Sequence, residues 1–143
     1  MKAAGFILAG ALCLAGCADH SQRVAGAVAG PPCQAPARAM VRTEMLFGAS
    51  RPDGRTVSDA EWVDFLDNDV TPRFPAGLTV LRGHGQWRGG DGGLVREQSR
   101  VLVIWHEPTD RTETDIEAIR AAYKRRFDQE SVMRVESVSC VSF

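Results

Sequence analysis

The apolar and polar positions from residue 41 onward predict four strands. Residues 41–47 and 131–138 alternate loosely between apolar and polar side chains, which is the period of a strand with one face in a core. Residues 78–87 and 94–106 flank the sequence Gly-Gly-Asp-Gly-Gly at 89–93. Because glycine adopts positive φ without steric cost, this run predicts a tight turn, and we expect the two flanking segments to pair as a β-hairpin.

Two further segments carry apolar side chains at helical spacing. The first starts at a capping box, Ser58 with Glu61 three residues later, and is expected to end before Pro72. A second capping box, Thr114 with Glu117, predicts the start of the second helix. The apolar faces consist of Trp62, Phe65, Leu66 and Val70 in the first helix and of Ile116, Ile119, Tyr123 and Phe127 in the second.

The order of these elements, strand-helix-strand-strand-helix-strand, is that of the ferredoxin-like βαββαβ motif. Because crossover connections are right-handed, the strands are expected to form one antiparallel four-stranded sheet in the order 4-1-3-2. Both helices then cover one face of the sheet, which gives an α+β domain predicted to span residues 40–143. The other face stays open for binding or for dimerisation.

The first sixteen residues have the features of a signal peptide. Lys2 precedes an apolar run at 6–14, which is far shorter than the stretch of about 20 residues that a membrane-spanning helix needs. The sequence Leu-Ala-Gly-Cys at 14–17 resembles the lipobox of bacterial lipoproteins. This resemblance implies cleavage after residue 16, a thioether diacylglycerol on Cys17 and a fatty acyl chain such as palmitate on the new terminus. An ordinary signal peptide with a chance cysteine is the alternative.

Residues 17–39 are rich in alanine, glycine and proline and show no periodicity, which predicts a flexible tether between the lipid and the domain. Several acyl chains together anchor a protein stably. We therefore expect the protein in the bacterial cell envelope, facing the periplasm, with the membrane as a partner through Cys17. Ala18 favours the outer membrane over the inner, since aspartate at that position is the inner-membrane signal in enterobacterial sorting.

Composition and charge change this picture little. The chain has 143 residues, a formal net charge of -1 and 24% charged residues, which is ordinary for one globular domain. A net charge so close to zero gives no reason to expect nucleic acid as a partner.

Two of the four cysteines remain once Cys13 is removed with the signal peptide and Cys17 carries lipid. Cys33 precedes the first strand and Cys140 follows the last, and these two points meet when the last strand pairs antiparallel with the first. In an oxidising compartment this arrangement predicts a disulfide between Cys33 and Cys140. Two free or intermolecular thiols are the alternative.

Four long stretches of the domain are more specific than generic strand or helix sequence. They are LFGASRPDG at 46–54, EWVDFLDNDVTPRFPAGLTVL at 61–81, GQWR at 85–88 and AIRAAYKRRFDQESVMRV at 118–135. Together they resemble a family of small bacterial envelope proteins that is defined only as a domain of unknown function. The resemblance covers nearly the whole domain, but it implies no reaction and therefore places no catalytic residue on this chain.

Polar residues near the two ends of the second strand form the candidate ligand-binding site. Arg73, His84, Gln86 and Arg88 are expected to line a pocket beside Trp87, whose ring would be a binding platform. A proline turn followed by a hairpin with a packed tryptophan is the purely structural alternative.

No catalytic, metal or cofactor site is predicted. His84 is expected to pair with residue 98 across the hairpin and so to lie far from His106, which argues against a shared metal ion. No serine shows the histidine and carboxylate partners of a hydrolase.

Two functions of different classes follow. The first is a non-catalytic envelope lipoprotein whose domain is a binding or assembly module, with a second copy or another envelope protein as its partner. The second is a small enzyme or ligand-binding protein of the dimeric α/β-barrel type, with a small-molecule site on the open sheet face. A deep pocket with groups of perturbed ionisation would favour the second, and a flat apolar face the first. Because no acid, base and nucleophile converge in the sequence, we favour a non-enzyme.

Overall fold

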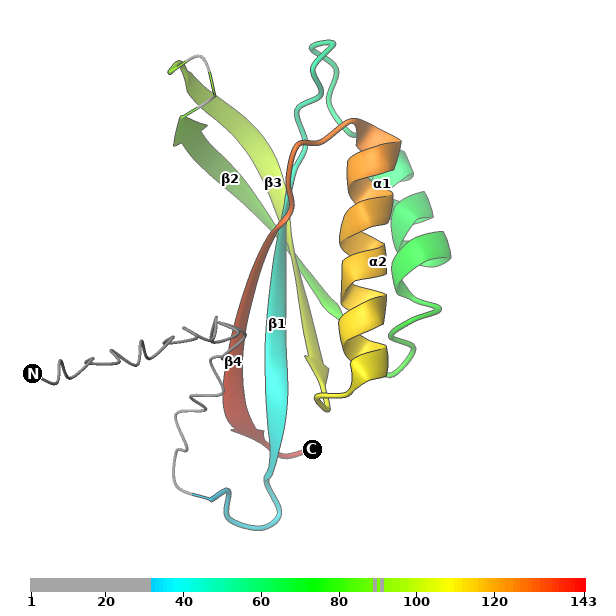
Figure 1. Cartoon of the computed structure of the whole chain (residues 1–143), viewed down its shortest axis with the longest axis vertical. Helices are drawn as coiled ribbons and strands as arrows, with labels where there is room; N and C mark the ends of the chain where they lie inside the picture. The colour runs from blue at the N-terminus through cyan, green and yellow to red at the C-terminus, as the bar shows by residue number, and fades with distance from the viewer. Residues whose placement is uncertain (1–31, 89, 91) are drawn as a thin grey trace, which may run out of the picture. The chain divides into compact units, whose positions relative to one another are not determined.

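The sheet has the predicted strand order, β2-β3-β1-β4, and all neighbouring strands are antiparallel. Helices α1 and α2 lie side by side on one face of this sheet, and no helix of the described residues covers the other face (Figure 1). The strands β1 and β3 form the central pair. This arrangement confirms the ferredoxin-like fold that the order of the elements predicts.

The computed structural model describes residues 32–88, 90 and 92–143, and Pro32–Phe143 form one compact unit. Cys17, the predicted signal peptide and most of the predicted tether lie outside the described residues. None of the described helices is long and apolar enough to cross a membrane. The elements are β1 (Arg38–Gly48), α1 (Asp59–Phe65), a π-helical turn that continues it (Leu66–Val70), β2 (Thr79–Arg88), β3 (Leu94–His106), α2 (Asp110–Phe127) and β4 (Met133–Val141).

Five aromatic rings form the centre of the core between the sheet and the helices. Phe47 on β1 lies 5.3 Å from Trp62 and 4.6 Å from Tyr123, measured between ring centroids. Phe65 from α1 and Phe127 from α2 complete this cluster. All five side chains are buried, and most of the ring pairs meet edge to face, a geometry that adds to the energy of burial. The helix faces predicted from spacing are therefore the faces that dock on the sheet.

Helix α1 begins where the sequence predicts. The Ser58 hydroxyl accepts a hydrogen bond from the backbone N–H of Glu61, and the Glu61 carboxylate accepts from the backbone N–H of Ser58 at 2.9 Å. These bonds from Ser58, with a further one from Arg51, lower the pKa of Glu61 to about 2. The capping box is thus fully formed.

The predicted start of the second helix at Thr114 is wrong, because α2 begins one turn earlier. Thr109 is its N-cap: its hydroxyl accepts from the backbone N–H of Thr112 at 3.1 Å, and the Thr112 hydroxyl accepts in return from the backbone N–H of Thr109. Thr114 lies inside the helix, where its hydroxyl donates to the carbonyl oxygen of Asp110. A threonine takes the role that the usual capping box gives to glutamate or glutamine, so the earlier start lacks the usual signature.

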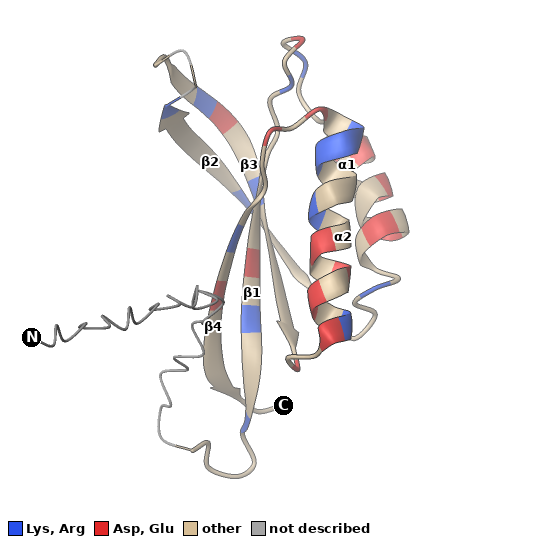
Figure 2. Ribbon diagram, viewed as in Figure 1, with Lys and Arg blue, Asp and Glu red and all other residues tan. Residues whose placement is uncertain are grey.

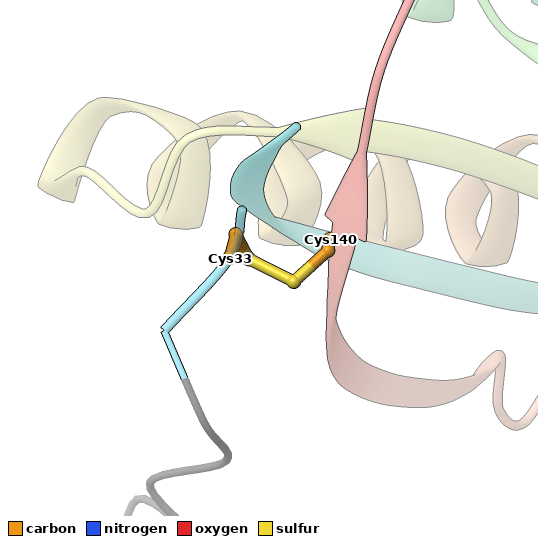
Figure 3. Close-up of a disulfide and its surroundings, with 2 residues drawn as sticks. All are labelled: Cys33 and Cys140. Carbon is orange, nitrogen blue, oxygen red and sulfur yellow. A yellow bond between two sulfur atoms is a disulfide. The ribbon is translucent and has the colours of Figure 1, made fainter. Parts of the chain in front are cut away.

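Cys33 and Cys140 form a disulfide, with their Cα atoms 5.5 Å apart (Figure 3). The pairing of β1 with β4 places Cys140 opposite Ala39, and a turn closed by a hydrogen bond from the Ala37 N–H to the Gln34 carbonyl returns Cys33 to the same end of the sheet. The predicted pairing is confirmed. The bond joins residues that are 107 apart in the sequence and fixes the point where the chain enters the domain.

Candidate binding surfaces

Two of the five predicted ligand-binding residues lie together on one face of the β2–β3 hairpin. Neighbouring positions of a strand point to opposite faces, and Leu102 on β3 is buried in the core beneath the helices. Val80 pairs with Leu102 and packs against this core. His84 and Gln86 are four and six positions after Val80 on the same strand, so their side chains project on the same side of the sheet. At that point the hairpin extends past the helices (Figure 1). Both side chains are exposed there.

Of the other three predicted residues, Trp87 and Arg73 lie elsewhere, and Arg88, on the same face as Gln86, is held at the hairpin turn. Trp87 projects from the opposite face of β2, and its ring N–H donates to Glu97 Oε1 at 3.0 Å. Arg88 donates to the carbonyl oxygen of Gly92 at the hairpin turn. Arg73 follows α1 at the other end of β2, where it donates to the carbonyl oxygen of Asp69. The five residues therefore do not converge on one pocket.

Across the hairpin, His84 and Gln86 meet residues of β3 that the sequence prediction missed. The cross-strand pairs are Arg82 with Arg100, His84 with Gln98, and Gln86 with Arg96. We call these six side chains the donor platform. Pairing the strands about the glycine turn places His84 opposite residue 98, as predicted, and the same register applied to the neighbouring positions would have found the remaining members.

Two open hollows lie along the donor platform. One of about 430 Å³ is lined by residues 84–86 and 96–98, and one of about 200 Å³ is lined by residues 82–84 and 98–100. The residues His84 and Gln98 border both hollows, so the two form one continuous shallow surface. This is not the deep pocket that would favour an enzyme.

One carboxylate supports two of the platform arginines. Asp59, at the start of α1, accepts from Arg100 at 2.7 Å and from Arg82 at 2.9 Å. These bonds, the one from Arg100 first, hold the pKa of Asp59 below its usual range. Arg100 is buried and its guanidinium lies 5.2 Å from the ring centroid of Trp62, within the range of a cation–π contact. Arg100 thus joins the platform to the core.

The open face of the sheet carries an apolar row that crosses all four strands. Leu46 on β1 pairs with Val101 on β3 and with Met133 on β4, and Val101 pairs in turn with Leu81 on β2. Leu46 lies between the core residues of β1, so its side chain and those of its partners project away from the helices. Met133 is 59% exposed and Leu81 is 51% exposed. Together with Val103 and Val135, which flank Glu44 in the next row, this row forms a flat, largely apolar face.

The open face also carries two charges of opposite sign on β1. Arg42 and Glu44 are two positions apart, so they project from the same side of the strand, and they form an ion pair. The Arg42 guanidinium lies 5.9 Å from the Trp105 ring centroid. Figure 2 shows that most other charged residues lie on the helices and toward the β2–β3 hairpin. The apolar row is therefore bordered on one side by this balanced pair and on the other by the Glu97 carboxylate, which lies against Gly48.

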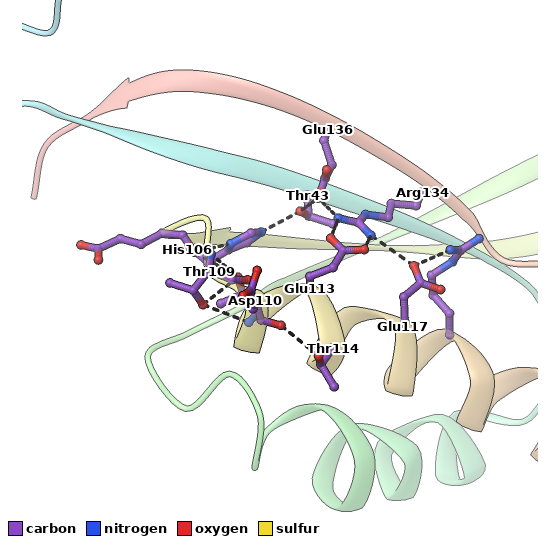
Figure 4. A network of polar contacts seen from close by, with 12 residues as sticks. Thr43, His106, Thr109, Asp110, Glu113, Thr114, Glu117, Arg134 and Glu136 are labelled. Carbon is purple, nitrogen blue, oxygen red and sulfur yellow. Dashed lines mark hydrogen bonds and ion pairs between the residues drawn. The ribbon is translucent and has the colours of Figure 1, made fainter. Parts of the chain in front are cut away.

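A second polar group is buried where the start of α2 meets the sheet (Figure 4). The Thr43 hydroxyl donates to Glu136 Oε1 at 2.7 Å and lies 2.9 Å from His106 Nε2. The other ring nitrogen of His106 lies 2.9 Å from the carbonyl oxygen of Glu107. Thr43 and His106 are buried, and nothing in the sequence signals this contact between residues 63 positions apart.

Arg134 extends this network from β4 to α2. It donates to Glu113 at 2.5 Å, to Glu136 at 2.6 Å and to Glu117 at 3.1 Å. The hydrogen bond to Glu113 raises the pKa of Arg134, and the same bond lowers the pKa of Glu113. Because these carboxylates are bonded within the chain, we interpret the network as a fastening of α2 to the sheet. Across the described residues, no group of three histidine, cysteine or acidic side chains is spaced to hold a metal ion.

A family model described as "Protein of unknown function (DUF3574)" matches residues 42–143. The chain belongs to this family. The match covers β1 to β4 and so the whole sheet and both helices, which is the region where the sequence resembles a domain of unknown function. No curated protein matches the chain.

Solved structures share the fold of this DUF3574 domain at low sequence identity. A phage SAM lyase in complex with S-methyl-5'-thioadenosine is 16% identical and covers 73% of this chain and 90% of its own, with a TM-score of 0.59. The same lyase in its apo state gives a TM-score of 0.54 at the same identity and coverage. CutA from Synechococcus elongatus PCC7942 is 10% identical, with a TM-score of 0.46, over 72% of this chain and 86% of its own. At 16% identity the likeness to the lyase concerns the fold alone.

Proposed function

We propose that this protein is a lipid-anchored envelope protein whose ferredoxin-like domain is an assembly module, and that its open sheet face binds a second copy of the chain. The observation that carries the assembly is the apolar row Leu81–Val101–Leu46–Met133, which crosses the whole sheet on the face without helices. An amphipathic sheet reaches its stable form when a second layer covers its apolar face.

Two features support the anchor. The sequence Leu-Ala-Gly-Cys at 14–17 follows a short apolar run, as in lipoprotein signals. The disulfide between Cys33 and Cys140 suits a protein that matures in an oxidising compartment such as the periplasm. The predicted tether has 15 residues between Cys17 and Cys33, and a flexible coil of that length would span roughly 20 Å, which would hold the domain close to the bilayer.

Metabolic labelling with an alkyne-bearing palmitate tests the anchor. We expect the wild-type chain, expressed in bacteria, to incorporate the fatty acid and to sediment with membranes. The Cys17→Ser chain should lose the label, whereas Cys13→Ser should keep it, because only Cys17 ends the motif. Equal labelling of the Cys17→Ser and wild-type chains would contradict the anchor.

A second copy is the occupant that the apolar row and the internally paired charges of the open face favour. Glu44 and Val103 pair at the centre of the face, on the two central strands. In a two-fold arrangement whose axis runs along the strands at this point, the apolar row of each copy would lie over that of the other, and the Arg42–Glu44 ion pair would keep each Glu44 charge compensated within its own copy. A symmetric interface must be complementary to itself in this way. Buried between the sheets, the apolar rows would then form a second core.

The size of the face indicates a weak dimer. The proposed contact area consists of three successive rows of outward-facing side chains, each of which crosses the four strands. These rows cover roughly 20 Å by 20 Å, from a strand spacing of about 4.8 Å and a rise of about 3.4 Å per residue. This is about 400 Å² for each copy, or half of what a standard interface buries on each partner. We therefore expect weak association in solution, which anchorage in one membrane plane would strengthen by raising the effective concentration.

Cross-linking of the full-length chain in membranes tests the interface. A Glu44→Cys substitution would place one thiol of each copy near the two-fold axis. We expect a short bifunctional maleimide to give a band of twice the monomer mass. The matched control is Val63→Cys on α1, because Val63 is 52% exposed but lies on the helical side. It should give little dimer.

Charges placed on the apolar row provide the second arm of this experiment. Leu81→Lys with Met133→Lys, added to Glu44→Cys, should lower the cross-linked fraction at least about tenfold, because lysines would be buried without partners. Both side chains are exposed in the single copy, so the fold should not change. No dimer from Glu44→Cys, equal dimer from Val63→Cys, or a product of another mass would overturn the second-copy assignment.

A further inference from the structure

The donor platform presents hydrogen-bond donors without a matching set of acceptors. Its side chains are three arginines, one histidine and two glutamines, on three successive cross-strand pairs. Arginine has only donors, and glutamine and histidine can each turn a donor outward. Apart from the backbone, Asp59 and the Gln86 carbonyl are the acceptors that meet the platform arginines within the described residues.

Arg96 is the platform arginine without a carboxylate partner among the described residues. Its Nε donates to Gln86 Oε1 at 3.0 Å, which is a neutral acceptor and fixes the plane of the guanidinium. Glu97 is next to Arg96 in sequence but projects from the other face, where it accepts from Trp87 and from the Ser50 N–H. The Arg96 side chain lines the larger hollow, and no carboxylate of the described residues pairs with it there.

The remaining donors surround the same hollow. His84 and Gln98 pair directly beside Arg96 and Gln86, and all four line the hollow of about 430 Å³. All four side chains are exposed. A group bound at this position would meet a bidentate guanidinium on one side, and an imidazole and an amide on the other.

We propose that the donor platform binds a phosphate ester, with Arg96 as the charge partner and His84 and Gln98 as further hydrogen-bond donors. A phosphate offers three terminal oxygens and a negative charge, which matches a planar guanidinium and two additional donors. The smaller hollow beside Arg82 would take the uncharged remainder of the molecule, since both arginines at that end already donate to Asp59. This site is independent of the sheet face proposed for assembly.

Amide and guanidinium NMR spectra of the full-length chain titrated with inorganic phosphate test the site. We expect saturable shifts for the Arg96 Nε–H and the Gln86 and Gln98 side-chain amides, with a Kd of about 1 mM or tighter for the bare ion. Arg96→Gln should weaken binding at least about tenfold, because it removes the charge and the bidentate fork. Arg111→Gln is the matched control, since Arg111 is an exposed arginine on α2 far from the platform.

The controls separate a built site from general attraction of anions. The spectrum of each variant without phosphate should overlay that of the wild type away from the substitution, which shows that the fold persists. Equal weakening by Arg111→Gln, unchanged binding by Arg96→Gln, or no saturable shift for the wild type would overturn the site. Acetate binding as tightly as phosphate would overturn the assignment of the ligand class.

Discussion

Replacing Cys33 and Cys140 together by serine is expected to lower the free energy of unfolding by about 4–5 kcal/mol. The disulfide joins residues 107 apart, and closing so long a loop removes much conformational entropy from the unfolded chain. For a domain of this size, such a loss corresponds to a fall in Tm of roughly 15–25 °C. Urea unfolding followed by circular dichroism measures the difference.

Reduction supplies the control for this prediction. Dithiothreitol should destabilise the wild-type chain by the same amount as the double substitution, and it should leave the doubly substituted chain unchanged. Because small domains have total stabilities of about 5–15 kcal/mol, the variant should stay folded at low temperature but be close to its limit at 37 °C. A loss below about 1 kcal/mol would mean that β1 and β4 already hold the chain ends together in the unfolded ensemble.

Substituting Phe47 by alanine is expected to cost about 4 kcal/mol of stability. Phe47 is fully buried on β1 and contacts aromatic rings from both helices. Its removal loses the transfer energy of the ring and leaves a cavity beneath α1 and α2, which is the combination that makes such substitutions costly. The m-value should stay close to that of the wild type if the fold persists.

Phe143→Ala is the matched control, since the same side chain is removed at a position that is 96% exposed. It should change the free energy of unfolding by less than about 0.5 kcal/mol. Similar effects at Phe47 and Phe143 would contradict the placement of the aromatic cluster. An intermediate variant, Phe47→Leu, should lie between alanine and wild type because it fills part of the cavity.

The sequence predicts the fold more completely than the site, and the elements show why. Strand order and helix faces follow from periodicity and from right-handed connections, which are local or general rules. The disulfide follows because an antiparallel pair brings chain ends together. The start of α2 is missed because Thr112 performs a function that the usual pattern gives to an acidic or amide side chain.

The candidate site is found only in part, because its members come from two strands. His84 and Gln86 are recognised as unusual polar residues of β2, but Arg96 and Gln98 become relevant only through the register of the hairpin. Arg73 and Trp87 are wrongly grouped with them, since closeness in sequence does not say which face of a strand a side chain leaves. The contact between Thr43 and His106 is beyond sequence reasoning because it depends on packing between distant segments.

The disulfide also determines how the domain would carry a mechanical load. Cys33 is the point where the chain enters the domain, and it is bonded to Cys140 on β4, the antiparallel neighbour of β1. The β2–β3 hairpin lies at the far end of the sheet (Figure 1). A pull between the proposed anchor and a ligand at the proposed hairpin site would therefore run along the strands and enter through β1 and β4 together. Their hydrogen bonds would share the force in shear instead of opening one after another from a frayed end.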